Sequence, residues 1–152
     1  MAMEVWELLV REAVRDTLAT YHAAGDRGRL EELAGCFHPD GSLEIAGREP
    51  LQGRTAISGR LSTLVADAQA SDQPSAPTRV RHHLASTHFQ LVTATEVRAS
   101  SYFAVMTDIG LDHWGRYADI LSPGDDRWLF RLRSVHVEGY APGSRFGRAR
   151  IP

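Results

Sequence analysis

The N-terminal half of the chain has the spacing of apolar positions that is typical of helices. Apolar residues recur mostly at steps of three and four between residues 4 and 24, which predicts one amphipathic helix. Gly25 favours the end of this helix, and Asp26 then lies on the turn, where it can begin a second, short helix around residues 30–34. A third helix is predicted over residues 55–70.

The period of the apolar positions changes to two after residue 78, which predicts strands. The expected strands are residues 42–46, 80–91, 96–107, 111–121 and 128–137. Short turns between the last four favour an antiparallel meander, and helices followed by a sheet indicate the α+β class. The connecting segment SDQPSAPT, residues 71–78, is a loop by composition. It either covers the mouth of a pocket as a lid or is a solvated connection.

Length and composition limit what this chain can be. Residues 1–140 suffice for one domain. The tail, residues 141–152, has little periodicity, so we expect it to be flexible or packed on a neighbouring subunit.

The net charge is −2 and the basic residues are scattered, which argues against nucleic acid or a membrane as a partner. No stretch resembles a signal peptide, and the single Cys36 fits a reducing cytoplasm. All 17 basic residues are arginines, and the lack of lysine excludes Schiff-base chemistry.

The candidate chemistry is concentrated in the run VRHHLASTHFQL, residues 80–91. His82 and His83 are adjacent, and because strand side chains alternate, only one of them can face a pocket on the inner side of a sheet. A neutral imidazole accepts a proton near neutral pH, and a carboxylate on its other ring nitrogen fixes the tautomer and stabilises the charged ring. Asp26, on the turn after the first helix, is the carboxylate that we expect to meet a histidine.

The order of these motifs resembles the SnoaL-like branch of the nuclear transport factor 2-like superfamily. It runs from the first helix and the turn aspartate through FHPDGSLEI, the third helix and RHHL to GRYADIL and RWLFRLRSV, about residues 5–138. The resemblance implies a cone-shaped α+β barrel, in which three N-terminal helices pack on a strongly curved, mostly antiparallel sheet around an apolar internal pocket.

Several lyases of this superfamily resemble the sequence at the positions that matter: scytalone dehydratase, bile-acid 7α-dehydratase and hexachlorocyclohexane dehydrochlorinase. Their aspartate after the first helix and their histidine on the first long strand match Asp26 and His83, which leaves His82 on the opposite face. Tyr21 matches a tyrosine of the bile-acid enzyme. His113 lies near a second histidine of scytalone dehydratase if a one-residue gap is allowed.

The alternation of side chains along the long strands suggests substrate contacts there. Tyr102, Met106 and Tyr117 can line the pocket, although each also suits packing. We expect no metal, because His82 and His88 are separated by roughly 20 Å along an extended strand and therefore cannot share an ion.

The leading hypothesis is a cofactor-free lyase or isomerase of the dehydratase type, with His83 as the base and a small apolar or aromatic, polycyclic substrate. A polyketide cyclase of the SnoaL type is one alternative, because an aldol closure also begins with the removal of a proton. The other alternative is a non-catalytic role, as a pocket for an apolar ligand or as an assembly subunit. In each case a homo-oligomer, dimer or trimer, is expected, because the outer face of such a sheet is commonly buried against another copy.

Overall fold

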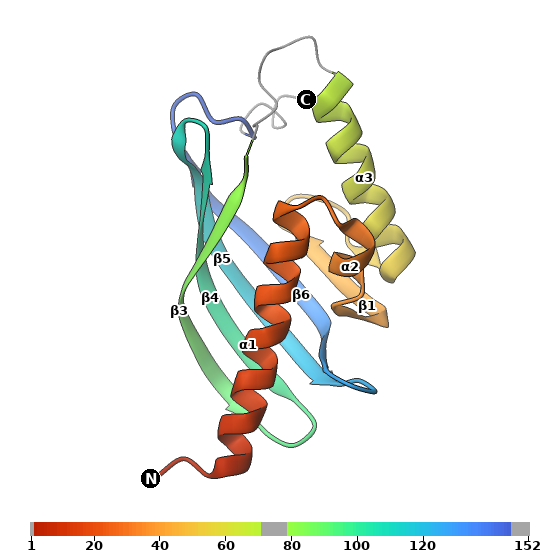
Figure 1. Cartoon of the computed structure of the whole chain (residues 1–152), viewed down its shortest axis with the longest axis vertical. Coiled ribbons are helices and arrows are strands. Elements are labelled where there is room, and N and C mark those ends of the chain that lie inside the picture. The colour runs from red at the N-terminus through yellow and green to blue at the C-terminus, as the bar shows by residue number, and fades with distance from the viewer. Residues whose placement is uncertain (1, 71–78, 147–152) are drawn as a thin grey trace.

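The computed structural model of the chain places three helices against one six-stranded sheet (Figure 1). It describes residues 2–70 and 79–146, and it describes no side chains for residues 64–70. The elements are α1 (Val5–Asp26), α2 (Leu30–Ala34), β1 (Phe37–Ile45), β2 (Leu51–Gln52), α3 (Arg54–Ala70), β3 (Arg81–Val92), β4 (Val97–Thr107), β5 (Gly110–Pro123) and β6 (Trp128–Tyr140). The α+β class, the helices and the four long strands are therefore confirmed.

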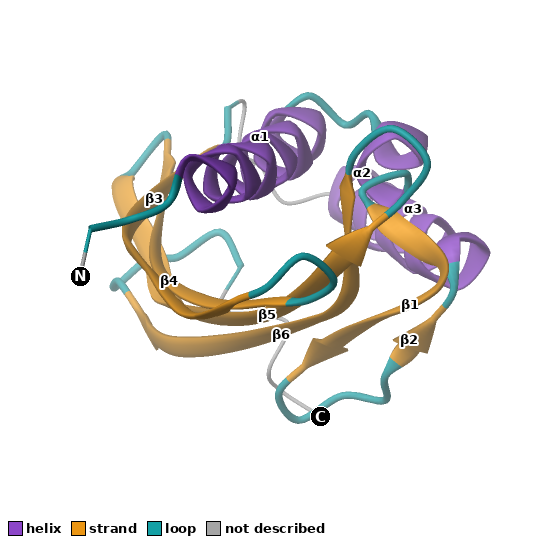
Figure 2. Cartoon of the chain, turned by 90° about the horizontal axis from the view of Figure 1, so that it is seen from below, coloured by secondary structure: helices purple, strands orange, loops and turns teal. Residues whose placement is uncertain are grey.

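The strand order across the sheet is β2-β1-β6-β5-β4-β3. Strands β3 to β6 form the predicted antiparallel meander, whereas β1 runs parallel to β6. Figure 2 shows α1 lying across the concave side of the curved sheet, with α2 and α3 beside β1. Because β3 is an edge strand, one side of its backbone is left for the end of α1 to contact.

The space between α1 and the concave side of the sheet is filled largely by aromatic side chains. Phe37, Phe103, Tyr117 and Phe130 are each at most 4% exposed. The buried residues of α1 begin only at Val14, so its amphipathic stripe packs on the sheet along the C-terminal part of the helix. This packing brings the last two turns of α1 close to the start of β3.

Residues 141–146 turn back onto the β4–β5 hairpin of their own chain. The Ser144 hydroxyl and the Arg145 amide both donate to Asp112, and the Arg145 guanidinium pairs with Asp108. This part of the tail therefore packs on its own chain. Residues 147–152 and the possible lid at 71–78 lie outside the described residues.

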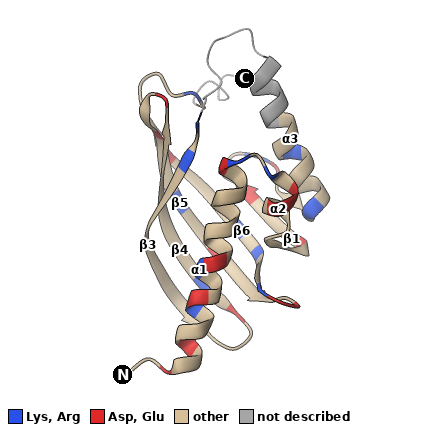
Figure 3. Ribbon diagram, viewed as in Figure 1, with Lys and Arg blue, Asp and Glu red and all other residues tan. Residues whose placement is uncertain are grey.

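Charged side chains are distributed over helices and strands alike (Figure 3). They include partly buried pairs such as Glu7 with Arg11, one turn apart on α1. Within the described parts of the chain, no helix combines the length and the apolar character needed to cross a membrane.

Candidate functional site

The end of α1 and the start of β3 meet at a carboxylate–histidine pair. Asp26, the last residue of α1, accepts a hydrogen bond from the backbone amide of His82, with 3.0 Å between N and Oδ2. Its other oxygen, Oδ1, lies 2.6 Å from Nδ1 of the His82 ring. Both carboxylate oxygens therefore contact one residue, and together they fix the strand and the ring relative to the helix.

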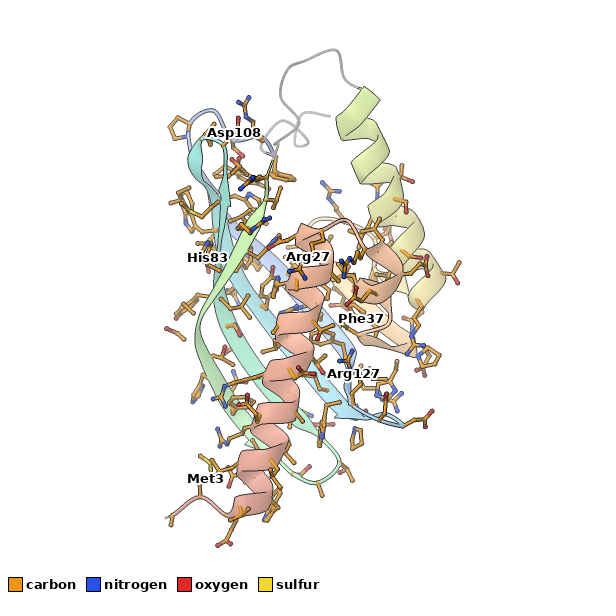
Figure 4. All side chains as sticks on the ribbon, viewed as in Figure 1. Met3, Arg27, Phe37, His83, Asp108 and Arg127 are labelled. Atoms are coloured by element: carbon orange, nitrogen blue, oxygen red, sulfur yellow. The ribbon has the colours of Figure 1, made fainter. Side chains whose placement is uncertain are left out.

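The structure corrects which of the two adjacent histidines faces the helix. His83, the residue predicted to meet Asp26, is exposed and lies beside Ala104 in the row of side chains on the outer face. Figure 4 labels His83 on the side of β3 away from α1. The physical reason is the register of the edge strand: the contact of Asp26 with His82 turns that residue inward, and alternation then turns the next one outward.

The hydrogen bonds also set the charge and tautomer of the pair. Burial alone would raise the pKa of the Asp26 carboxyl, but the hydrogen bonds from His82 outweigh it and hold that pKa below its ordinary value. Asp26 is therefore ionised at neutral pH, and Nδ1 of His82 must supply the hydrogen of their contact. In the neutral ring, Nε2 is then the proton acceptor.

A groove of about 450 Å³ runs between α1 and β3 beside this pair, within the range of roughly 300–1,000 Å³ that is usual for small-molecule sites. Its lining residues are Arg15, Leu18, Ala19, His22, Ala23, Asp26, His82, Leu84 and Thr87. The helix residues recur at the three- and four-residue steps of one face. On β3, a bulge with Ser86 at φ 51° shifts the inward positions from even to odd numbers.

His22, one helical turn before Asp26, is a second histidine of this groove. Its ring stacks on that of His82, with 5.1 Å between centroids and 30° between planes. The residue is 7% exposed, and its Nε2 has no hydrogen-bond partner among the described residues. Burial, reinforced by the positive charge of Arg133, lowers the pKa of His22 far below its ordinary value, so the ring is neutral.

A buried ion pair lies deeper in the fold, behind His22. Arg133 donates from Nε and Nη2 to the two oxygens of Asp119, at 3.0 and 3.2 Å, and both side chains are 0% exposed. The guanidinium carbon lies 3.9 Å from the ring centroid of Tyr117 and 4.4 Å from that of Tyr21. Both tyrosines lie between α1 and the concave side of the sheet, where they pack in the core, and they are not among the residues that line the groove.

His113 is also on the concave side, two strands away from His82. Val105 of β4 is paired with both residues, so the two histidines share one row across the sheet. Nδ1 of His113 lies 2.9 Å from Oδ1 of Asp112, and its ring stacks on Tyr140. His113 is thus a second imidazole oriented by a carboxylate, outside the lining of the groove.

Tyr102 and Met106, predicted as substrate contacts, are on the wrong face for that role. They are 59% and 38% exposed, whereas their neighbours Ser101, Phe103 and Val105 are buried. Period-two alternation puts the two sets on opposite faces of β4. Among the side chains that the structure describes, no three from His, Cys, Asp or Glu come together as a metal site would require.

The family model of the SnoaL-like domain matches residues 6–134. The chain belongs to the SnoaL-like domain family. The fold of this SnoaL-like domain is the nuclear transport factor 2-like fold, which solved relatives also describe as cystatin-like. A search of curated proteins finds no match.

Solved structures similar to this SnoaL-like domain include two from Catenulispora acidiphila, each 28% identical. The match with the first spans 89% of this chain and 96% of the Catenulispora chain, with a TM-score of 0.75. The match with the second, a complex with S-DNPA, spans 86% of this chain and 95% of the Catenulispora chain, with a TM-score of 0.71. A structure from Novosphingobium aromaticivorans, described as a candidate scytalone dehydratase, is 20% identical over 94% of this chain and 97% of its own, with a TM-score of 0.71. At that identity the similarity concerns the fold.

Sequence reasoning missed two polar features of this SnoaL-like domain. His22 had a usable signal, because a residue four positions before Asp26 lies on the same face of a helix. The pairing of Arg133 with Asp119 had no local signal, since it depends on the register between β5 and β6.

Proposed function

We propose that this SnoaL-like domain is a small-molecule lyase or isomerase of the dehydratase type, in which His82 and Asp26 form the acid/base pair. The observation that carries the proposal is the double contact of Asp26 with His82 beside a groove of about 450 Å³. Both groups come from the chain, and the proton transfers that follow use no cofactor.

The reaction begins at Nε2 of His82, which removes a proton from a carbon made acidic by an adjacent carbonyl or ring. The electrons of the broken C–H bond form a double bond as the bond to a β-oxygen breaks. The proton on Nε2 then passes to the leaving oxygen, so that one water is released. Asp26 stabilises the charged ring between the two transfers without taking the proton itself. Acid/base catalysis of this kind contributes about 10²- to 10⁴-fold in rate, which suits elimination next to an acidifying group.

The side chains that line the groove favour an apolar, flat substrate. Leu18 and Leu84 face it from α1 and β3, and the stacked rings of His22 and His82 add a planar surface. An aromatic or polycyclic body would bury apolar area against these side chains. The complex of the Catenulispora relative with S-DNPA supports small-molecule binding on this fold.

The test compares two adjacent histidines that differ in the direction of their side chains. A panel of aromatic and polycyclic β-hydroxy ketones is incubated with the protein in water and in deuterium oxide, and products are analysed by mass spectrometry. A product that is lighter than the substrate by one water indicates elimination. A product with the same mass as the substrate indicates isomerisation or simple cyclisation. His82→Ala should lower turnover by about 10²- to 10⁴-fold.

His83→Ala is the matched control, because it removes the same side chain from the exposed face one residue away. It should keep the activity of the wild type. Undiminished turnover by His82→Ala, or loss of turnover confined to His83→Ala, would contradict the assignment. A groove that binds ligands without any change that depends on His82 would favour the non-catalytic role.

A further inference from the structure

One residue of the groove wall has a buried polar atom that no described residue satisfies. Nε2 of His22 has no hydrogen-bond partner among the described residues, although the residue is 7% exposed. Buried polar groups are nearly always paired, because an unpaired one loses its water without compensation. His22 lines the same groove as Asp26 and His82, which places its ring next to any molecule bound there.

We propose that His22 is a substrate-binding residue whose Nε2 forms a hydrogen bond with a hydroxyl or carbonyl oxygen of an aromatic ligand. The assignment deepens the proposed function and rests on it for the identity of the groove as the substrate site.

The position of the ring is fixed from both sides. His82 stacks on it at 5.1 Å, and Tyr117 lies 5.4 Å away with 44° between the ring planes. The ring centroids of His22 and His82 are 5.1 Å apart, so one ligand can place an oxygen at the first ring and a carbon at the second. A carbonyl oxygen with its neighbouring carbon, or a phenol oxygen with a ring carbon, provides such a pair.

The ring also has the charge state that this role requires. His22 is neutral, because it is buried and has a cationic neighbour, Arg133, without a carboxylate of its own. A neutral imidazole donates or accepts at Nε2 according to its tautomer, so it pairs with a neutral oxygen or with a developing enolate. His82, which Asp26 holds, is left to carry the proton.

Two substitutions separate ligand binding from packing. His22→Phe keeps an aromatic ring in place and removes Nε2, whereas His22→Gln keeps a side chain that can form hydrogen bonds. The probes are 2-naphthol and naphthalene, which differ by one hydroxyl, and their affinities are measured by NMR titration. His22→Phe should bind 2-naphthol about tenfold more weakly than the wild type and should bind naphthalene within about twofold of it. His22→Gln should retain part of the preference for 2-naphthol.

Thermal unfolding supplies a readout that a packing role would not reproduce. Removing an unsatisfied polar atom should leave the Tm of His22→Phe unchanged or raise it by about 2–4 °C. The matched control is His38→Phe, because His38 is also 7% exposed, but its Nε2 is satisfied by Ser122 at 2.8 Å, outside the groove lining. That variant should unfold at a lower temperature and bind 2-naphthol as the wild type does.

Three outcomes would overturn the assignment. They are equal binding of 2-naphthol by wild type and His22→Phe, a wild type that binds neither probe or both equally well, and a His22→Phe protein that loses both probes together with stability. Naphthol affinity does not depend on turnover, whereas the proposed function is decided by the turnover of His82→Ala. Failure of one therefore remains distinguishable from failure of the other.

Discussion

Replacing Asp26 with asparagine tests the charge and the hydrogen bonds that position His82. The amide oxygen can still accept the backbone N–H of His82, but the amide NH₂ then faces Nδ1 of the ring. An NH₂ group can only donate, so Nδ1 becomes an acceptor and the ring hydrogen moves to Nε2. The substitution therefore removes the lone pair from the atom that would take the substrate proton.

The expected magnitude follows from the two contacts, 2.6 and 3.0 Å long, around a side chain that is 10% exposed. Hydrogen bonds to a charged group contribute about 1.5–3 kcal/mol, and asparagine keeps neutral versions of them, so the free energy of unfolding should fall by about 1–3 kcal/mol. For a chain of 152 residues, that change lowers Tm by about 2–12 °C. Turnover of any substrate should fall by about 10²- to 10⁴-fold.

The pH dependence has a definite sign. Because the folded-state pKa of Asp26 is lowered from 3.8, its contribution to stability is fully present above that pH and is lost as the pH falls through the lower folded-state value. The difference in stability between wild type and Asp26→Asn should therefore be constant near neutral pH and shrink in acid.

Urea unfolding at a series of pH values measures this difference, and ¹⁵N NMR of the His82 ring reports its tautomer. Asp40→Asn is the control, because Asp40 is 75% exposed in its pair with Arg131 and should contribute little. A wild-type Tm at neutral pH together with an unchanged ring tautomer in Asp26→Asn would refute the reasoning.

Two further predictions concern the interior and the outer face. Arg133→Met leaves the carboxylate of Asp119 buried without its partner, so urea unfolding should show a loss of about 3–5 kcal/mol, which the double variant with Asp119→Leu should largely restore. On the outer face, Tyr102 and Trp114 are 59% and 36% exposed, and we propose that this apolar surface joins two copies of the chain. Trp114→Arg should then reduce the mass measured by light scattering to that of one chain, whereas Trp6→Arg, on α1, should not.

The long strands were predictable because their information is local. Strand β4 alternates buried and exposed residues over nearly its whole length, and turn residues bound it on both sides. The start of β1 was not predictable in this way. Phe37 belongs to the strand because it pairs with Phe130, more than ninety residues away in the sequence, whereas the apolar pattern predicted a strand only over residues 42–46.

The candidate site was predictable only in part, for a related reason. Asp26 and the pair of adjacent histidines are visible in the sequence, but alternation only says that His82 and His83 point in opposite directions. Which of them points inward depends on the contact between the end of α1 and the edge of β3. The bulge at Ser86 then changes the parity again within the same strand, so the pattern farther along β3 could not correct the choice.

The three histidines on the concave side differ in what their surroundings allow them to do. His82 and His113 each hold a carboxylate at Nδ1, from Asp26 and Asp112, which lets a ring gain a proton without leaving an unpaired buried charge. For His113, burial lowers the pKa although Asp112 acts to raise it. His22 is buried and has no carboxylate partner among the described residues, so its ring can form a hydrogen bond but cannot take up a second proton and become charged at neutral pH. Proton transfer needs a ring that can change charge beside the substrate, and of these three rings only that of His82 combines a carboxylate partner with a place in the groove. The division of roles that we propose therefore follows from the positions of two aspartates.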